Sequence, residues 1–287
     1  MSMQTVSRKR IRLGATRSNK MLLVIPAVGL LALFFIYPIV TILLRSFSEP
    51  QWGLQNYAAF FRESAYLGSL ANTFKIAVAV TLITLVLGYL VAYAMTTVGS
   101  KMRKFILIAV LIPFWTSLLV RTYAWMVLLQ SEGIINRSLL YLGIIHEPLQ
   151  LIHNFTGVII GMVYTMLPFM ILPIYATMAS IDPGLMRAGA NLGAPPAVVF
   201  TRIFMPLTLP GVGAGSIMVF VMTIGYYITP ALLGGSKDTM IGQFIAEQIQ
   251  SLLNWGMGAT AAVVLVTTTM IFFVFYLKIN RLERRAS

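Results

Sequence analysis

The sequence predicts an all-α integral membrane protein with about six transmembrane helices, and three observations lead to this prediction. Hydrophobic residues make up 58% of the 287 residues, charged residues make up only 10%, and the mean hydropathy is +0.85. A soluble domain is about a quarter charged, so this chain has too few charges to cover a surface in water. Its apolar runs are long and unbroken, unlike the alternating strands of an outer-membrane barrel. Its basic residues also gather on one side of the predicted membrane.

The first three predicted spans are apolar runs that exceed the 20 or so residues needed to cross about 30 Å of hydrocarbon. The first, about 21–44, follows a basic segment from Arg8 to Lys20 and is too long for the apolar core of a signal peptide. The second is about 72–98. The third, about 105–129, follows a short basic segment at 99–104.

The last three predicted spans lie at about 152–179, 204–229 and 257–279. The first two of them contain pairs of glycines four residues apart, which fit close packing of helices. These pairs are Gly157 with Gly161 and Gly211 with Gly215. The predicted organisation is a basic cytoplasmic N-terminal tail (1–20), one transmembrane domain (21–280) with a cytoplasmic loop at about 180–203, and a cytoplasmic C-terminal tail (281–287).

The distribution of basic residues predicts the orientation. With the N-terminus in the cytoplasm, the inside segments hold 15 Lys and Arg residues and two acids, whereas the outside segments hold six of each. The whole net charge of +13 then lies on one side, which is the positive-inside pattern. Both termini are therefore predicted to be cytoplasmic. No nucleic-acid partner is expected, because the basic residues are not gathered on a folded face.

Enzymatic chemistry is not expected of this sequence. The chain has no cysteine, and so no disulfide, thiolate metal site or cysteine nucleophile. Ser216 lacks a base, because the two histidines, His146 and His153, belong to an outside loop. No Gly-x-x-x-x-Gly-Lys-Ser/Thr motif occurs, so no phosphate-binding loop is present. No catalytic residue and no metal ligand is predicted.

The segment 180–203 carries the clearest local pattern. Asp182 is placed as an N-cap with Pro183 at the first helical position, and Gly193 is placed to end this short helix. A second short helix opens at Pro195 and Pro196 and continues toward the fifth span. Leu185, Ala188, Gly189 and Leu192 are predicted to fall on one face of the first short helix. The loop is expected to make close contact with another protein, because its exposed apolar residues, Leu185, Leu192 and Phe200, would need covering.

This segment resembles the EAA loop of bacterial ABC-importer permeases, which has Glu-Ala-Ala, three residues, Gly and a later apolar-Pro ending. Matching positions are Ala188, Gly193, Ala194, Phe200, Pro206 and Pro210. Arg187 stands where the family has Glu, and Gly189 where it has the second Ala. The resemblance implies a type I importer permease of the inner membrane, which binds no cofactor because separate ATPase subunits use ATP and Mg. The residues it assigns to coupling with the ATPase are Leu185, Met186, Arg187, Ala188, Gly189, Leu192, Gly193, Ala194 and Phe200.

Two further stretches resemble the spermidine/putrescine-type permeases, namely 112–136 and 232–242. This resemblance implies import of polyamines from the periplasm by alternating access. It also implies three partners: a periplasmic binding protein, an ATPase dimer and a second, different permease subunit. Another small solute is an open alternative. Two other classes are disfavoured. A carrier driven by an ion gradient would need ionisable groups at mid-membrane, and the predicted spans almost lack them. A membrane scaffold that transports nothing would need no coupling loop.

Residues near the outer side are candidates for the solute path, because acids and aromatic faces hold cations. The aromatic members are equally interpreted as anchors at the membrane interface. Arg121, the one charge near the interior of an apolar run, either has a functional role or reaches the outer interface and pairs with an acid such as Glu132. The candidates are Trp115, Arg121, Tyr123, Trp125, Glu132, Tyr226, Tyr227, Asp238 and Glu247.

Overall fold

The computed structural model describes residues 17–286, which form helices and loops without a strand, and side chains within 24–274. The prediction of an all-α protein is confirmed. Most of the predicted N-terminal tail, residues 1–16, and Ser287 of the C-terminal tail lie outside the described residues. The helices are α1 (Arg17–Leu31), α2 (Tyr37–Ser48), α3 (Gln55–Arg62), α4 (Ser64–Thr97), α5 (Ser100–Trp115), α6 (Leu118–Leu129), α7 (Ile134–Tyr141), α8 (Phe155–Ala179), α9 (Pro183–Asn191), α10 (Pro196–Val199), α11 (Met205–Ile224), α12 (Ile228–Leu233), α13 (Ile241–Gln250) and α14 (Trp255–Ala286).

Within the described part of the chain, five helices are long and apolar enough to cross a membrane, and a sixth span results if one bent pair of helices is counted. Five of the six predicted spans coincide with these helices, with ends displaced by no more than about two helical turns. Two π-helical turns, Ala32–Ile36 and Phe200–Phe204, are continuous with neighbouring helices. The five helices are Val24–Ser48, Ser64–Thr97, Phe155–Ala179, Pro196–Ile224 and Trp255–Val274.

The third predicted span, 105–129, is wrong as one straight helix. The chain bends by 104° between α5 and the helices that follow it. Pro113 lacks a backbone N–H and weakens the last turns of α5. The Thr116 hydroxyl then donates to the Pro113 carbonyl at 3.0 Å, an acceptor that the N–H of Ser117 would use in a continuing helix. Hydropathy is high on both sides of the bend, so the hydropathy of the sequence does not predict the bend.

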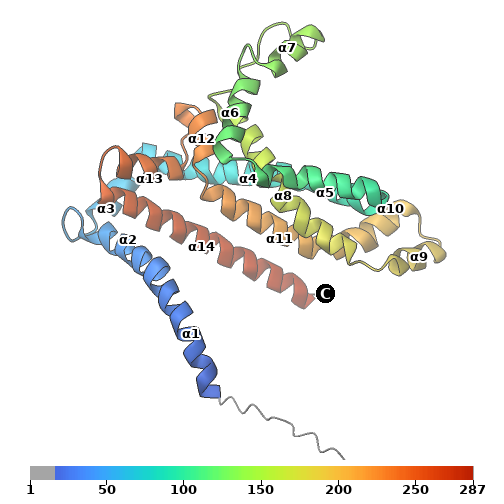
Figure 1. Ribbon diagram of the computed structural model, residues 1–287, viewed down its shortest axis with the longest axis horizontal. Helices are drawn as coiled ribbons and strands as arrows, with labels where there is room; N and C mark the ends of the chain where they lie inside the picture. Colours follow the sequence, from blue (N-terminus) through green and yellow to red (C-terminus); the bar gives the residue numbers. More distant parts are fainter. Residues whose placement is uncertain (1–16, 287) are drawn as a thin grey trace, which may run out of the picture.

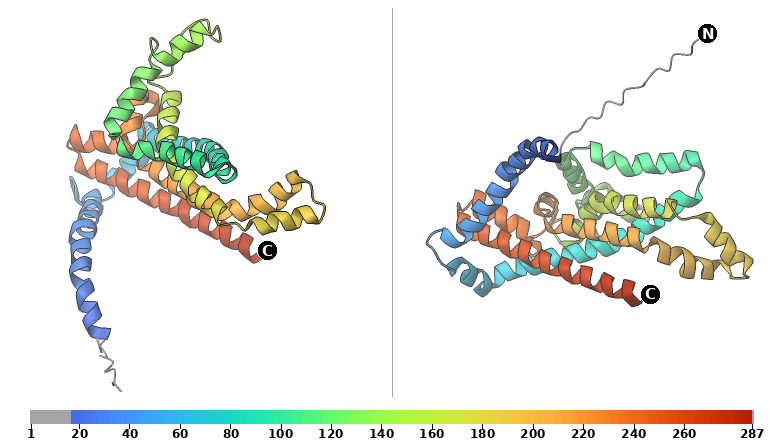
Figure 2. Two further views of the ribbon diagram at one scale, coloured as in Figure 1. Left: turned by 45° about the vertical axis from the view of Figure 1, so that its right-hand side comes forward. Right: turned by 90° about the horizontal axis from the view of Figure 1, so that it is seen from below.

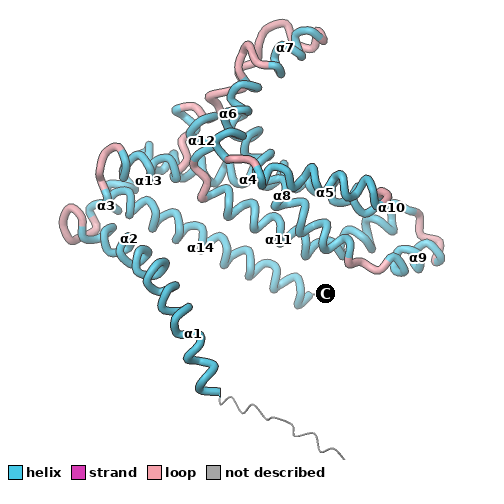
Figure 3. The backbone as a smooth tube through the Cα atoms, in the orientation of Figure 1, coloured by secondary structure: helices cyan, strands magenta, loops and turns pink. Residues whose placement is uncertain are grey.

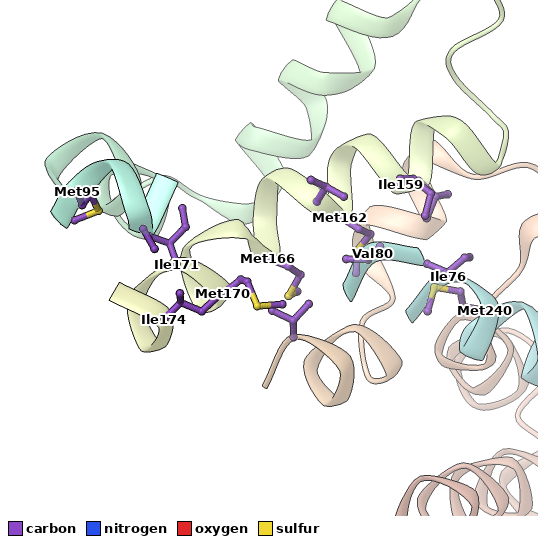
Figure 4. Packing of buried hydrophobic residues seen from close by; sticks show 14 of the residues in the cluster. Ile76, Val80, Met95, Ile159, Met162, Met166, Met170, Ile171, Ile174 and Met240 are labelled. Atoms are coloured by element: carbon purple, nitrogen blue, oxygen red, sulfur yellow. The ribbon is translucent and has the colours of Figure 1, made fainter. Parts of the chain in front are cut away.

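Helix α8 is the centre of the bundle and packs between α4 and α11. Two thirds of its most apolar stretch is buried, 67% against 33% for α4. Its buried face is rich in methionine, with Met162, Met166 and Met170 fully buried (Figure 4). Methionine is unbranched and fills irregular gaps between helices, so these side chains form the core of the protein.

Glycines allow the three central helices to approach closely. A Cβ on Gly88 of α4 would lie 2.9 Å from Met170 Cγ, and one on Gly215 of α11 would lie 2.9 Å from Met170 Sδ. A Cβ on Gly211 would lie 2.8 Å from the Pro173 carbonyl oxygen. The close packing predicted for the Gly211 and Gly215 pair is therefore confirmed.

The bundle has two distinct ends and two parts that leave it. Helices α9 and α10 lie at one end, and α3, α12 and α13 lie at the other (Figure 1). The loops gather mainly at these ends and around α7 (Figure 3). Helix α1 stands away from the bundle in both further views (Figure 2), whereas α2 packs against α14; none of the most apolar stretch of Val24–Ser48 is buried. Helices α6 and α7 leave the bundle near α12 (Figure 1).

Candidate functional site

The loop at one end of the bundle has the predicted helix–turn–helix structure. The Asp182 carboxylate accepts a hydrogen bond from the Gly184 backbone nitrogen at 2.8 Å, which caps α9 at its start. Gly193 follows the helix with a φ of +82°, the left-handed conformation that glycine adopts most readily. The Gly193 and Ala194 nitrogens donate back to carbonyls of α9 at 3.0 and 3.2 Å. The predictions of the N-cap and of the terminating glycine are confirmed.

The second half of the loop is joined rigidly to a membrane helix. Helix α10 begins at Pro196 and passes without interruption through the π-helical turn Phe200–Phe204 into α11. The turn is fixed laterally, because Tyr93 of α4 packs edge-on against the rings of Phe200 and Phe204. The loop is therefore continuous with α11 and packed against α4.

The predicted contact face of α9 is divided in the structure. Leu192 is 88% exposed and Leu185 45% exposed, and Ala188 is exposed beside them. Gly189 instead is buried, and a Cβ there would lie 2.6 Å from Ile203 Cδ1. The prediction that Gly189 shares one face with Leu185, Ala188 and Leu192 is wrong. Because Gly189 has no side chain, α9 packs at this position against the turn that leads into α11.

The other predicted coupling residues fall into two groups. Arg187 and Gly193 are exposed, whereas Met186, Ala194 and Phe200 are partly buried. The partly buried three line a cleft of about 610 Å³ behind α9. Sequence reasoning missed the rest of this cleft because its polar members come from the ends of other helices: Tyr93, Thr96, Thr97, Arg103 and Tyr175.

A second cavity, of about 170 Å³, lies where α5 and α6 meet α8 and α11. Arg121 and Tyr226 both line it, so the structure brings two of the predicted path residues together. Glu132 does not pair with Arg121, because its carboxylate lies 3.3 Å from Arg137. That alternative for Arg121 is therefore wrong. The cavity's remaining lining was missed because it is scattered over apolar segments: Pro113, Phe114, Thr165, Met166, Pro168, Phe169 and Met222.

The remaining aromatic candidates do not converge on this cavity. Trp125 packs edge-on against Tyr164 of α8, with ring centroids 5.4 Å apart. Trp115 is 91% exposed, Tyr123 54% and Tyr227 39%. These four residues are absent from the lining of the cavity that contains Arg121.

The acidic candidates lie outside the five long apolar helices. Asp238 ends a short turn that is tied to α4, because the Asn72 side chain donates to the Lys237 carbonyl at 2.7 Å. Glu247 is exposed on α13, and Glu132 is exposed and paired with Arg137. None of the three lines the cavity. Within the described residues, no group of three His, Asp or Glu side chains could hold a metal ion.

Comparison with known proteins gives the family of the chain. Residues 84–287 match the binding-protein-dependent transport system inner membrane component. The chain is 33% identical over 267 residues to the spermidine/putrescine transport system permease protein PotB of Salmonella typhimurium, covering 90% of this chain and 93% of that protein. It is 33% identical to the inner membrane ABC transporter permease protein YdcU of Escherichia coli, covering 82% of this chain and 78% of that one.

A solved structure has the same fold. A chain of a bacterial alginate ABC transporter, in complex with a periplasmic protein that carries an alginate pentasaccharide, superposes with a TM-score of 0.75. It covers 92% of this chain and 95% of its own length at 17% identity, so the likeness concerns the fold. The chain is thus a non-catalytic, multi-pass subunit, and the ATPase of its transport system is a separate chain. It belongs to the family of binding-protein-dependent transport system inner membrane components.

Proposed function

We propose that this chain is one of two permease subunits of an ATP-driven importer that carries polyamines from the periplasm to the cytoplasm by alternating access. Similarity to the PotB proteins over 90% of the chain supports the solute class. The observation that carries the proposal is the exposed apolar face of α9, which is fixed to a membrane helix. Leu192, at 88% exposure, needs a protein partner to cover it, and the separate ATPase dimer is that partner.

The path from the ATPase to the solute runs along one helix. Helix α11 begins at Met205, next to the coupling loop, and ends at Ile224. Its 20 residues span about 30 Å at 1.5 Å per residue. Near its outer end, Met222 lines the cavity that contains Arg121. Closure of the ATPase dimer would move α9 and α10, and α11 would carry the displacement to this cavity as a rigid body.

A polyamine crossing the membrane needs compensation for its positive charges. The five unbroken spans of the described residues contain no acid, so this chain provides mainly aromatic faces such as that of Tyr226. Acids along the inner part of the path therefore come from the second permease. The periplasmic binding protein sets most of the selectivity. The absence of acids in these spans also speaks against a carrier driven by an ion gradient.

Purification and uptake together test this proposal. The tagged chain, expressed with its complete transport system, is expected to retain an ATPase and a second permease in detergent. Cells that lack other routes are expected to accumulate labelled putrescine or spermidine only with the intact system. Uptake of a neutral or anionic solute alone would overturn the solute class and leave the importer assignment. Purification without any ATPase would overturn the coupling role of α9.

A further inference from the structure

Arg121 is a partly buried cation that has no charged partner among the described residues. Its Nε atom is buried and has no hydrogen-bond partner, and the described residues form no ion pair with it. It lines the cavity of about 170 Å³ beside Thr165 of α8.

A guanidinium in this position requires an anion. Arginine stays charged in proteins, so its partial burial leaves a positive charge that needs compensation. Charged groups within a membrane are unfavourable, and they face a partner or a water-filled cavity. The hydroxyls of Thr165 and Tyr226 in the cavity can accept hydrogen bonds, but they carry no charge. The planar fork of arginine best matches a carboxylate, with two parallel hydrogen bonds.

No acid among the described side chains supplies that carboxylate. Glu49 lies 3.6 Å from Arg45, and Glu132 pairs with Arg137. Asp182 caps α9 at the opposite end of the bundle. The other described acids, which also do not line the cavity, are Glu63, Glu147, Asp238 and Glu247.

The surroundings of Arg121 show where another chain can approach. Helix α6 has only 12 residues, leaves the bundle at the 104° bend and is apolar over most of its length (Figure 1). Val120, directly before Arg121, is 66% exposed, and Tyr123, two residues after it, is 54% exposed. A short apolar helix that projects from its own bundle has faces for a neighbouring membrane protein to cover.

We propose that Arg121 binds a carboxylate side chain of the second permease subunit. This rests on the proposed function, which requires two permeases. A solute cannot be the permanent counter-ion, because it passes only transiently, and a polyamine would be repelled by the guanidinium. The pair also removes a net positive charge from the solute path of a cation importer. It joins the two permeases beside the cavity that α11 reaches.

Cysteine cross-linking tests the contact independently of transport. The chain has no cysteine of its own, so an Arg121→Cys variant carries a single thiol. The complete transporter is expressed with this variant and with a second permease freed of any native cysteine. Each Asp and Glu in the spans of that permease is replaced in turn by cysteine. One position is expected to form an oxidant-dependent cross-link. The matched control is Arg137→Cys. Arg137 is exposed on α7, and its cysteine variant is expected to cross-link with none of the introduced cysteines of the second permease.

Transport provides the second readout. An Arg121→Gln variant is expected to reduce uptake at least tenfold. Neutralising the cross-linking acid is expected to reduce uptake similarly, and the double variant to be no worse than either single one. Additive losses, or the lack of any cross-link in a transporter that imports normally, would overturn the pair. If Arg121→Gln instead admits different solutes while no cross-link forms, the guanidinium contacts solute and the inference is wrong. Cross-linking without polyamine uptake would overturn only the proposed solute.

Discussion

Tyr93 of α4 packs edge to face against Phe200 of the coupling loop, with ring centroids 5.3 Å apart and planes at 78°. An aromatic pair of this geometry contributes about 0.5–1.5 kcal/mol beyond the burial of its area. Tyr93 belongs to a 34-residue helix and Phe200 to the turn that continues into α11. This contact thus joins two of the three central helices to the surface proposed to receive the ATPase.

Removing this contact is expected to separate hydrolysis from transport. In Tyr93→Ala, the loop loses its lateral support, so uptake should fall several-fold while the complex still hydrolyses ATP. Uptake and ATPase activity are measured on the same reconstituted preparation. Tyr37→Ala, which removes a tyrosine that is 67% exposed on α2, is the control. Equal losses of both activities in Tyr93→Ala would contradict a role in coupling.

The geometry of Gly193 gives a second prediction. Proline requires a φ near −65°, which is incompatible with the +82° found at Gly193, so Gly193→Pro should displace α10 relative to α9. The variant is expected to insert in the membrane and to lose coupled uptake. Gly143→Pro is a matched control, since Gly143 also has a positive φ of +67° and lies in the outer loop. Ala188→Glu, on the exposed face of α9, should uncouple as well, and normal uptake by both loop variants would remove the coupling role.

Packing around Met170 predicts a loss of stability. In Gly88→Val, the added Cβ would lie 2.9 Å from Met170 Cγ, and overpacking of this kind destabilises by about 1–3 kcal/mol. A lower midpoint of thermal aggregation in detergent would report this loss. The control, Gly68→Val, is on the same helix with nothing within 4 Å. Adding Met170→Ala to Gly88→Val should restore part of the stability, and no recovery would contradict the assigned clash.

The predicted orientation can be tested by labelling. Ala190 is exposed on α9, and Tyr141 is 92% exposed at the end of α7. Because the chain lacks cysteine, Ala190→Cys and Tyr141→Cys each carry one thiol. A membrane-impermeant maleimide added to intact spheroplasts should label Tyr141→Cys and should label Ala190→Cys only after lysis. Efficient labelling of Ala190→Cys from outside would reverse the topology.

The outer acids give a prediction about solute entry. Replacing Asp238 by Asn or Glu247 by Gln removes negative charge near the outer mouth, where a polyamine arrives. Uptake is expected to slow by several-fold, while the affinity of the separate binding protein for its solute stays the same. Transport in proteoliposomes and solute binding to the isolated binding protein measure the two effects. Unchanged uptake in the double variant would exclude both acids from the path.

Features that depend on neighbouring residues were predicted well from the sequence. The apolar runs identified five of the helices, and the cap by Asp182 and the positive φ of Gly193 followed from residue type. The bend after Pro113 was missed, because hydropathy measures solvent preference and carries no information on direction. The side of α9 on which Gly189 lies depends on Ile203 in another element, so the helical period alone assigned it wrongly.

The candidate path was predicted only in part. The cavity beside Arg121 collects Phe114, Thr165 and Met222 from three helices far apart in sequence, and no local pattern links them. The pairing proposed for Glu132 was wrong because Arg137, in the first turn of α7 and five residues away in sequence, pairs with Glu132 instead.

The methionines of α8 have a consequence for how easily the bundle changes shape. Met162, Met166 and Met170 form a continuous strip along the helix, between α4 and α11. Branched side chains interlock in few arrangements, whereas methionine has three freely rotating bonds and adapts to a displaced neighbour. Sliding of α11 by a fraction of a turn can then be absorbed by rotamer changes, without opening voids. The interior is in this respect a compliant layer, in which two alternative alignments of the helices can differ little in energy.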